Sequence, residues 1–349
     1  MTFFINALFL ILLVLVTGCG KEKVNSEEIN TPIEEQNKEE VKFIVDESSK
    51  TRPFAVMINC HNDALPQAGL NDAYMVYEII VEGGESRLMA LFKGVSLDKI
   101  GPVRSSRHYF LDYALENDAI YVHFGWSPQA KSDITKLGVD NINGISESST
   151  SFWRTKDKYA PHNVATSTEK ILSIANRKGY ATTSTKESVL NYVADEVELD
   201  SDIEATKITI PYSDHNTVEY EYDNVTKRYT RYSRDTKQVD WTTGETVTTK
   251  NIIVVKCDNW KISGDTSGRQ TIDNVKALSG YYITNGKAIE ITAEKSTRSS
   301  QTVYKDLQGN EIDVNDGNTF VQICPIDRNV EITPGKPQVQ ETTNVINNQ

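Results

Sequence analysis

Residues 73–95 read AYMVYEIIVEGGESRLMALFKGV and give the clearest local indication of the fold. Two runs within them, Ala73 to Glu82 and Arg87 to Val95, are largely apolar and have the length of β-strands. The segment Glu82-Gly83-Gly84-Glu85-Ser86 joins them and contains two glycines, which is typical of a hairpin turn. These residues therefore predict a β-hairpin.

Strand and helix signals alternate around this hairpin. Apolar runs at 54–58 and 119–124 are typical of strands, and residues 106–117 have apolar side chains at helical spacing. Three more helices are expected: one from Ser127-Pro128 to Gly138, one after a capping box at Thr166 and Glu169, and one at 186–194. We therefore expect a mixed α+β fold whose first part is an α/β-type domain with a helix-covered mixed sheet.

Only strand signals follow from about residue 207. Asn285-Gly286 is the strongest turn signal among them, because type I′ hairpin turns need positive φ at both central residues. A smaller, mainly antiparallel β domain is expected here. The expected boundaries are a signal peptide at 1–19, a disordered acidic tether at 20–50, the N-terminal domain at 51–194, a linker at 195–206, the β domain at 207–330 and a disordered tail at 331–349.

Composition restricts the class of protein. The 349 residues are 38% hydrophobic and 25% charged, which excludes collagen, a polytopic membrane protein and a wholly disordered chain. The length suffices for two ordinary cores. Because the net charge is −12, the chain would be repelled by a phosphate backbone, and nucleic acid is not expected as the main partner.

The N-terminal residues have the pattern of a signal for export and lipid attachment. The unbroken apolar run from Ala7 to Val16 suits a signal peptide and is shorter than the ~20 residues of a membrane-spanning helix. Val16-Thr17-Gly18-Cys19 then resembles the bacterial lipobox, in which the cysteine thiol takes a diacylglyceryl group. The alternative is an ordinary secretory signal that contains a cysteine. We expect Cys19 to be the lipid attachment site that holds the mature chain on the extracytoplasmic face of the cell membrane.

Cysteine and histidine usage gives no cofactor site. With Cys19 lipidated, three thiols remain, and an odd number cannot pair completely within one chain. Cys257 and Cys324 are compatible with a disulfide and equally with two reduced thiols. Cys60 is an improbable nucleophile, because its neighbour His61 would point to the opposite face of a strand. The five histidines lack the spacing of zinc ligands, so neither a metal nor a cofactor is expected.

The richest polar content lies in the first domain. Glu82 and Arg87 flank the hairpin turn, and Arg104, Ser105 and Arg107 stand at the start of an expected helix. Free N–H groups at a helix start and forked guanidinium donors both attract carboxylate or phosphate groups. The sequence thus indicates an anion site. The alternative is that the arginines only pair with acidic neighbours in a structural network.

Two further segments are candidates for the same site. His123 and Trp126 stand where an expected strand ends and a helix begins, which is where α/β domains tend to bind ligands. His162 and Asn163 precede the next helix and offer an imidazole and an amide. Trp126 can stack on a sugar ring, although such residues are more often half-buried core. Taken one by one, both histidines fit structural roles better than catalytic ones.

Several motifs in a fixed order are similar to one known family. They are residues 52–58, 82–87, 100–107, 152–154, 161–163 and 317–322. Between about Arg52 and Pro325 the chain resembles the YerB-type lipoproteins of low-GC Gram-positive bacteria, a family of uncharacterised envelope proteins. The resemblance implies a lipoprotein with two family-specific domains, and it supplies no established reaction.

Three functions are compatible with these observations. The preferred one is a non-enzymatic envelope protein that binds an anionic or glycan wall component, or a protein of cell-wall assembly, near Glu82, Arg104, Arg107 and His162. The second is an envelope hydrolase that cleaves a glycosidic or phosphodiester bond with Glu82 and a histidine, although no known nucleophile motif supports it. The third is a purely structural adaptor that acts through the β domain.

Overall fold

A computed structural model describes residues 49–335 of the chain. The signal peptide, the expected lipid attachment site at Cys19, nearly all of the tether and residues 336–349 of the tail lie outside the described residues. Within 49–335, every helix is too short or too polar to span a lipid bilayer.

The predicted hairpin is present at the centre of a large sheet. Its strands β2 (Met75–Ile80) and β3 (Ser86–Phe92) pair antiparallel. Gly84 in the turn has a φ of 74°, and a Cβ at this position would lie 2.8 Å from the Cβ of Ser213. Because glycine alone meets both conditions without strain, the sequence specifies this turn closely. The hairpin prediction is confirmed.

The sheet has eleven strands among the described residues, in the order β20-β19-β18-β15-β22-β2-β3-β1-β4-β5 with β9 beside β19. β1 (Phe54–Asn59) pairs antiparallel with β3 and parallel with β4 (Ile120–His123), and β2 pairs parallel with β22 (Thr319–Pro325). The carboxyl ends of β1, β2, β4 and β22 therefore lie at one edge. The other strands are β5 (Asn141–Asn143), β9 (Ile203–Glu204), β15 (Asn251–Cys257), β18 (Ala277–Thr284), β19 (Lys287–Glu294) and β20 (Val303–Asp306).

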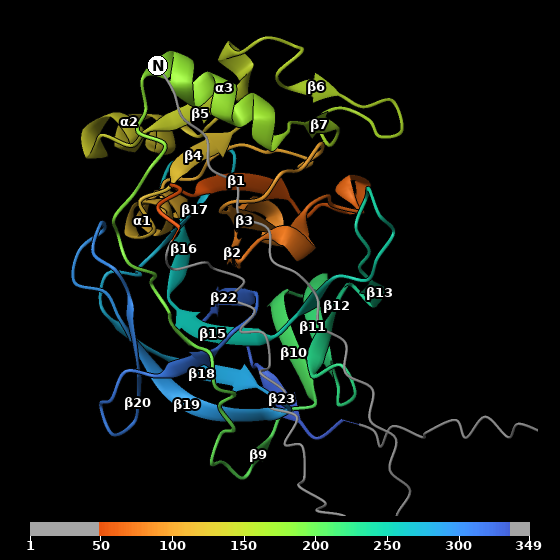
Figure 1. Cartoon of the computed structure of the whole chain (residues 1–349), viewed down its shortest axis with the longest axis vertical. Coiled ribbons are helices and arrows are strands. Elements are labelled where there is room, and N and C mark those ends of the chain that lie inside the picture. Colours follow the sequence, from red (N-terminus) through yellow and green to blue (C-terminus); the bar gives the residue numbers. More distant parts are fainter. Residues whose placement is uncertain (1–48, 336–349) are drawn as a thin grey trace, which may run out of the picture. The chain divides into compact units, whose positions relative to one another are not determined.

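A second sheet has six strands among residues 49–335, in the order β13-β12-β11-β10-β23 with β14 beside β12. Figure 1 shows β10, β11 and β12 in green, side by side and apart from the larger sheet. Its strands are β10 (Lys207–Ser213), β11 (Asn216–Asp223), β12 (Arg228–Ser233), β13 (Thr236–Lys237), β14 (Thr248–Thr249) and β23 (Glu331–Thr333). The last of these belongs to the segment expected to be the tail.

Strand alternation distributes the core over both faces of the large sheet. Ala55 and Met57 of β1 belong to one buried cluster, which also contains Phe110 and Leu111. Val56 of β1 belongs to a second cluster, which includes residues of the smaller sheet such as Ile208, Ile210 and Tyr212. One face of the large sheet is thus covered in part by another sheet.

The helices are few and short. They are α1 (Phe110–Glu116), α2 (Pro128–Leu137) and α3 (Thr168–Lys178) in the described chain. Ser127 caps α2 and Gly138 ends it in the left-handed conformation, as predicted. The cap of α3 is Ser167 rather than Thr166, whose backbone pairs with Ile100 instead.

The helix expected at 186–194 is absent, and that prediction is wrong. This segment contains β8 (Asn191–Val193), which pairs parallel with β21 (Asp313–Asn315). The remaining short strands are β6 (Trp153–Arg154), β7 (Val164–Ala165), β16 (Asn259–Lys261) and β17 (Gln270–Ile272).

The expected fold class, a mixed α+β fold with a helix-covered N-terminal sheet, is wrong. Among residues 49–335, strands account for 42% and helices, the 3-10 helices included, for only 14%. The reason is that strands from the second half of the chain extend the first sheet and add a second sheet on its face, where we expected helices. The linker expected at 195–206, which would separate two domains, stays a prediction.

A buried ion pair joins the two sheets. Glu78 of β2 accepts a hydrogen bond of 2.6 Å from Arg231 of β12, and both side chains are about 1% exposed. Ser86 donates to the other carboxylate oxygen at 2.6 Å. Because both charges are removed from water, each depends on the other, and the pair ties the packing of one sheet to that of the other.

Candidate functional site

A polar cluster lies at the edge where parallel strands end. β1 leads into a short 3-10 helix, η1 (Asn62–Ala64), and β2 leads into another, η3 (Glu82–Gly84). The segment that contains Arg104 runs between the ends of β1 and β4, because the Arg104 amide donates to the carbonyl of Met57 and its carbonyl accepts from Phe124, which follows β4. Three separated loops are therefore brought together at this edge.

Glu82 is held by two guanidinium groups. Arg107 donates to both of its carboxylate oxygens, with an Nε to Oε2 distance of 2.8 Å, and Arg87 lies 3.7 Å from Oε1. Burial opposes ionisation of the carboxyl, but the hydrogen bonds and charge of Arg107 and the charge of Arg87 outweigh it and lower its pKa to about 2. Glu82 is therefore a permanent carboxylate at neutral pH.

Arg87 and Arg104 each have an N–H donor that forms no hydrogen bond. Arg87 is 5% exposed and donates from Nη1 to the carbonyl of Ser105 at 2.6 Å, but its buried Nε has no partner. The Nε of Arg104 is also buried without a partner, and within residues 49–335 the guanidinium forms no hydrogen bond or ion pair. Burial, followed by repulsion from Arg107, lowers the pKa of both, that of Arg87 to about 10. The cluster therefore has more positive charge than Glu82 balances.

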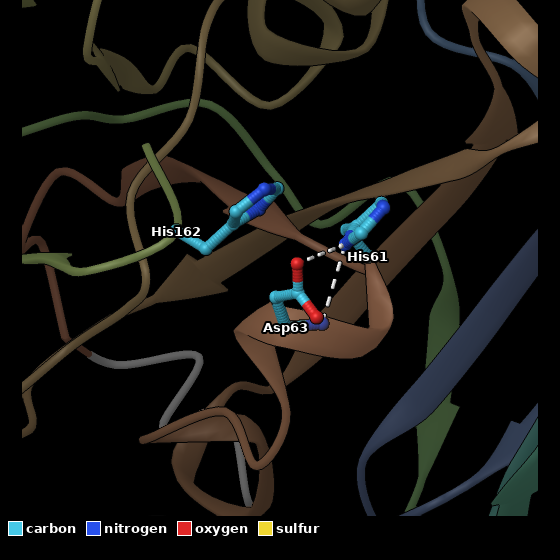
Figure 2. A group of neighbouring side chains, drawn as sticks. All are labelled: His61, Asp63 and His162. Carbon is cyan, nitrogen blue, oxygen red and sulfur yellow. Dashed lines mark hydrogen bonds and ion pairs between the residues drawn. The ribbon is translucent and has the colours of Figure 1, made fainter. Parts of the chain in front are cut away.

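His162 borders this cluster together with His61, which caps η1, and Asp63 within η1. Its Nδ1 lies 2.8 Å from the Asn59 amide nitrogen, and its ring stacks on that of His61 with centroids 4.4 Å apart. Figure 2 shows Asp63 beside His61, with His162 coming from a separate loop. Burial and the charges of His61 and Arg104 lower the pKa of His162, so the imidazole is mostly neutral at pH 7.

Within the described residues, the His123 and Trp126 side chains form no hydrogen bond or ion pair with the charged groups of the cluster, although the backbone of Trp126 pairs with that of Ser106. His123 is fully buried, with Nδ1 at 2.8 Å from the carbonyl of Gly125 and Nε2 at 3.2 Å from the Asn141 side chain. Burial lowers its pKa to about 4. The Trp126 ring, 36% exposed, lies over His123 and near Lys131. His123 thus acts as a sealed, neutral hydrogen-bonding group.

This buried histidine predicts acid sensitivity. In the unfolded chain it takes a proton near pH 6.5, while the folded protein resists protonation down to about pH 4, so stability is complete above pH 6.5 and lost as the pH falls. Between pH 7.5 and pH 5 its contribution to the free energy of unfolding should fall by about 2 kcal/mol. Urea denaturation at both pH values should show this loss in the wild type and a smaller one in His123→Gln. An equal loss in both proteins would contradict the assignment.

Asn163 has a structural role in the loop that carries His162. Its side chain accepts from Arg154 at 2.7 Å and donates to the carbonyls of Thr155 and Lys158. Its amide oxygen and nitrogen are therefore already engaged within the protein and, unlike the Nε groups of Arg87 and Arg104, offer no unpaired donor. Asn163 positions the loop, while His162 reaches the cluster.

The three thiols of the described chain are free and buried. Burial raises the pKa of Cys60, Cys257 and Cys324 to about 12 each, so they are protonated and poorly nucleophilic at neutral pH. Cys257 and Cys324 belong to different buried clusters and form no disulfide with each other, so of the two alternatives left open the structure has reduced thiols.

A hollow of about 840 Å³ lies at the opposite edge of the sheet, near the start of β1. Its lining includes Lys50, Lys93, Lys186 and Glu311. Lys50 and Lys186 are exposed, so water already satisfies their charge. The strand-end cluster is the stronger candidate, because its donors are buried and lack partners.

Comparison with known proteins shows to which family the chain belongs. Residues 42–181 match the N-terminal domain of a protein of unknown function, DUF3048, and residues 208–321 match its C-terminal domain. The chain belongs to the DUF3048 family. This DUF3048 protein is also 32% identical over 288 residues to "Putative lipoprotein YerB" of Bacillus subtilis strain 168, which covers 79% of the chain and 82% of that relative.

A solved structure supports the fold of this DUF3048 protein. It is similar to the crystal structure of the YerB protein from Bacillus subtilis, with a TM-score of 0.72 and 31% identity over 80% of this chain and 94% of that one. The resemblance found in the sequence is therefore confirmed. The family description gives no activity.

Sequence reasoning missed two residues of the cluster in this DUF3048 protein. His61 and Asp63 lie two positions apart in and before η1, next to His162. The His-x-Asp spacing after a strand was the available signal. It was weak because the third member is about a hundred residues away in the chain.

Proposed function

We propose that this protein is an extracytoplasmic lipoprotein, anchored to the membrane through Cys19, that binds an anionic polymer of the cell envelope. The lipobox-like motif at residues 16–19 and the name of the Bacillus relative support the anchor. Attachment of paired acyl chains would give stable membrane binding, whereas one chain gives only marginal binding. The signal peptide expected at residues 1–19 supports the extracytoplasmic face of the membrane.

The observation that carries the binding proposal is the unpaired guanidinium of Arg104. Three arginines, at 87, 104 and 107, surround one carboxylate, that of Glu82, which leaves a local excess of positive charge. The Nε groups of Arg87 and Arg104 are buried donors without acceptors. A phosphate or carboxylate group would supply these acceptors, and guanidinium forks suit both.

An exposed aromatic ring supports a glycan or polyol backbone in the ligand. Tyr159 is 86% exposed, and its carbonyl accepts from the His162 amide at 2.8 Å, so it adjoins the cluster. Aromatic rings pack against the apolar faces of sugars while polar groups bind the substituents. An anionic polymer with a polyol or sugar backbone would use both features.

Hydrolysis through Glu82 receives less support. A general acid needs a pKa raised towards neutrality, and a general base needs an available carboxylate of moderate pKa. The pKa of Glu82 is about 2 and both its oxygens are engaged by Arg107. Glu82 is better suited to orient the arginines than to transfer a proton.

The test compares Arg104→Ala with a matched control. Titration of the lipidated chain in detergent with poly(glycerol phosphate) should show saturable binding that weakens about tenfold or more in Arg104→Ala, because a charge-assisted contact is lost. Arg328→Ala also removes one positive charge, but from an exposed pair with Asp214, and should bind like the wild type.

Three other outcomes would each contradict part of the proposal. Unchanged affinity in Arg104→Ala with an intact fold would show that the site is wrong. Release of shorter polymer products would favour the hydrolase, especially if Glu82→Gln abolished it. Absence of both binding and turnover with phosphate polymers and peptidoglycan fragments would favour the adaptor.

A further inference from the structure

A second group of side chains adjoins the arginines and has a different chemistry. His61, Asp63 and His162 each offer one ligand atom, and these atoms lie within 4.8 Å of one another. Figure 2 shows the Asp63 carboxylate close to the His61 imidazole, with the His162 imidazole nearby. We propose that these three residues bind one divalent transition-metal ion of the zinc class.

The ligand set suits such an ion. Two imidazoles and one carboxylate form a three-residue set of the kind that holds zinc while leaving a coordination position open. The presence of two nitrogen donors favours zinc, nickel or copper over magnesium and calcium, which prefer oxygen ligands. The site would thus discriminate between these two groups of ions.

The donor atoms of His162 and Asp63 are largely free to coordinate, whereas the Nδ1 of His61 accepts a hydrogen bond of 3.2 Å from the Asp63 amide, which an ion bound at this atom would replace. Within the described chain, Nε2 of His162 makes no hydrogen bond, and the only partner of the Asp63 carboxylate is His61, at 3.6 Å from its Nδ1. The His61 and Asp63 side chains are 42% and 69% exposed, so both can rotate. The stacked imidazoles must tilt, because their lone pairs lie in nearly parallel planes, 23° apart, and a shared ion needs them to converge.

Asn59 would support the liganded state. Its side chain lies 2.8 Å from Nδ1 of His162 and is itself 4% exposed. If the amide turns so that its oxygen accepts from Nδ1–H, the lone pair of Nε2 becomes available to a metal, and the 3.2 Å bond that this oxygen accepts from the His61 amide is lost. Metal-bound histidines commonly donate their second N–H to such an acceptor.

Positive and negative groups both surround the three residues, so their charges allow a cation to bind there. Arg104 acts on His162 as a positive charge, while Asp63 and Glu85 act as negative ones. Glu85 is itself paired with Arg234. The Asp63 carboxylate would therefore offset the charge of a bound ion, which can bind despite the positive charge of Arg104 nearby. This inference does not depend on polymer binding by Arg104.

The experiment is a calorimetric titration of the lipidated, untagged chain in detergent with zinc chloride at pH 7.5, with no polymer present. We expect one ion per chain, and at least tenfold weaker binding in His61→Ala and in His162→Ala. Asp63→Asn should also weaken it. His215→Ala is the matched control, because it removes an exposed histidine outside the group, and should leave the affinity unchanged.

Two further measurements sharpen the result. Magnesium chloride at a thousandfold excess should not displace the zinc. X-ray absorption at the zinc edge should show two imidazole nitrogens with oxygen donors, and no sulfur. Absence of stoichiometric zinc binding, equal weakening in His215→Ala, or a sulfur donor would each overturn the proposal. Arg104→Ala should retain zinc binding, which separates this result from that of the polymer titration.

Discussion

Glu78→Ala should lower the free energy of unfolding by about 3–5 kcal/mol, because it leaves the Arg231 guanidinium buried without its counter-ion. Arg231 would keep the side chain of Gln238 as a hydrogen-bond partner, but a neutral amide does not replace a charge. The residues that pack around the pair belong to both sheets, so the loss should act on the whole cooperative unit. Urea denaturation followed by tryptophan fluorescence measures it.

Two comparisons test this cause. Glu204→Ala breaks an exposed pair with Lys287 and should cost less than about 1 kcal/mol. The double change Glu78→Leu with Arg231→Met removes both charges and should recover most of the lost stability, since no uncompensated ion remains. A Glu78→Ala protein as stable as Glu204→Ala would show that the pair does not couple the sheets.

Cys19→Ala should abolish lipidation of the protein altogether. The thiol is the attachment atom, so its removal leaves no site for the diacylglyceryl group, and the energy that two acyl chains contribute to membrane binding is lost. Metabolic labelling with an alkyne fatty acid should mark the wild type and not Cys19→Ala. The mutant should also shift to the soluble fraction.

The control for this prediction is another cysteine. Cys257 is buried and reduced, so Cys257→Ala should keep the label. Persistent labelling of Cys19→Ala, or its continued partitioning into detergent, would contradict lipid anchoring at this residue.

Local features of the fold could be predicted from the sequence. The Gly83-Gly84 turn and the helix from Ser127-Pro128 to Gly138 form as expected, because each depends on φ preferences and caps within a few residues. The Asn285-Gly286 turn joins β18 and β19 for the same reason. Such signals need no information from distant parts of the chain.

The fold class could not be predicted because it depends on distant pairing. β2 and β22 are parallel neighbours although they are more than two hundred residues apart, and no local pattern specifies that register. The apolar runs that suggested a helix-covered sheet are covered in part by β10 to β12. The burial of Glu78 could likewise not be predicted from the sequence, because its partner Arg231 comes from another sheet.

The candidate site was predictable in part. Charge and turn patterns indicated Glu82, Arg87, Arg104 and Arg107, which the structure brings together at the strand ends. The two predicted histidines illustrate the limit. Both precede helices, yet His123 is sealed within the core while His162 borders the cluster, and this difference depends on burial rather than on sequence context.

If Arg87 and Arg104 bind an anion through their unpaired N–H donors, NMR of the lipidated chain with ¹⁵N-labelled arginine should detect it, because the Nε–H signals can be followed while phosphate polymer is added. We expect the signals of Arg87 and Arg104 to shift together and saturate, while that of Arg298, already bonded to Asp112, stays in place. Anion binding at these two arginines would be refuted if their signals remained fixed or if all arginine signals shifted alike.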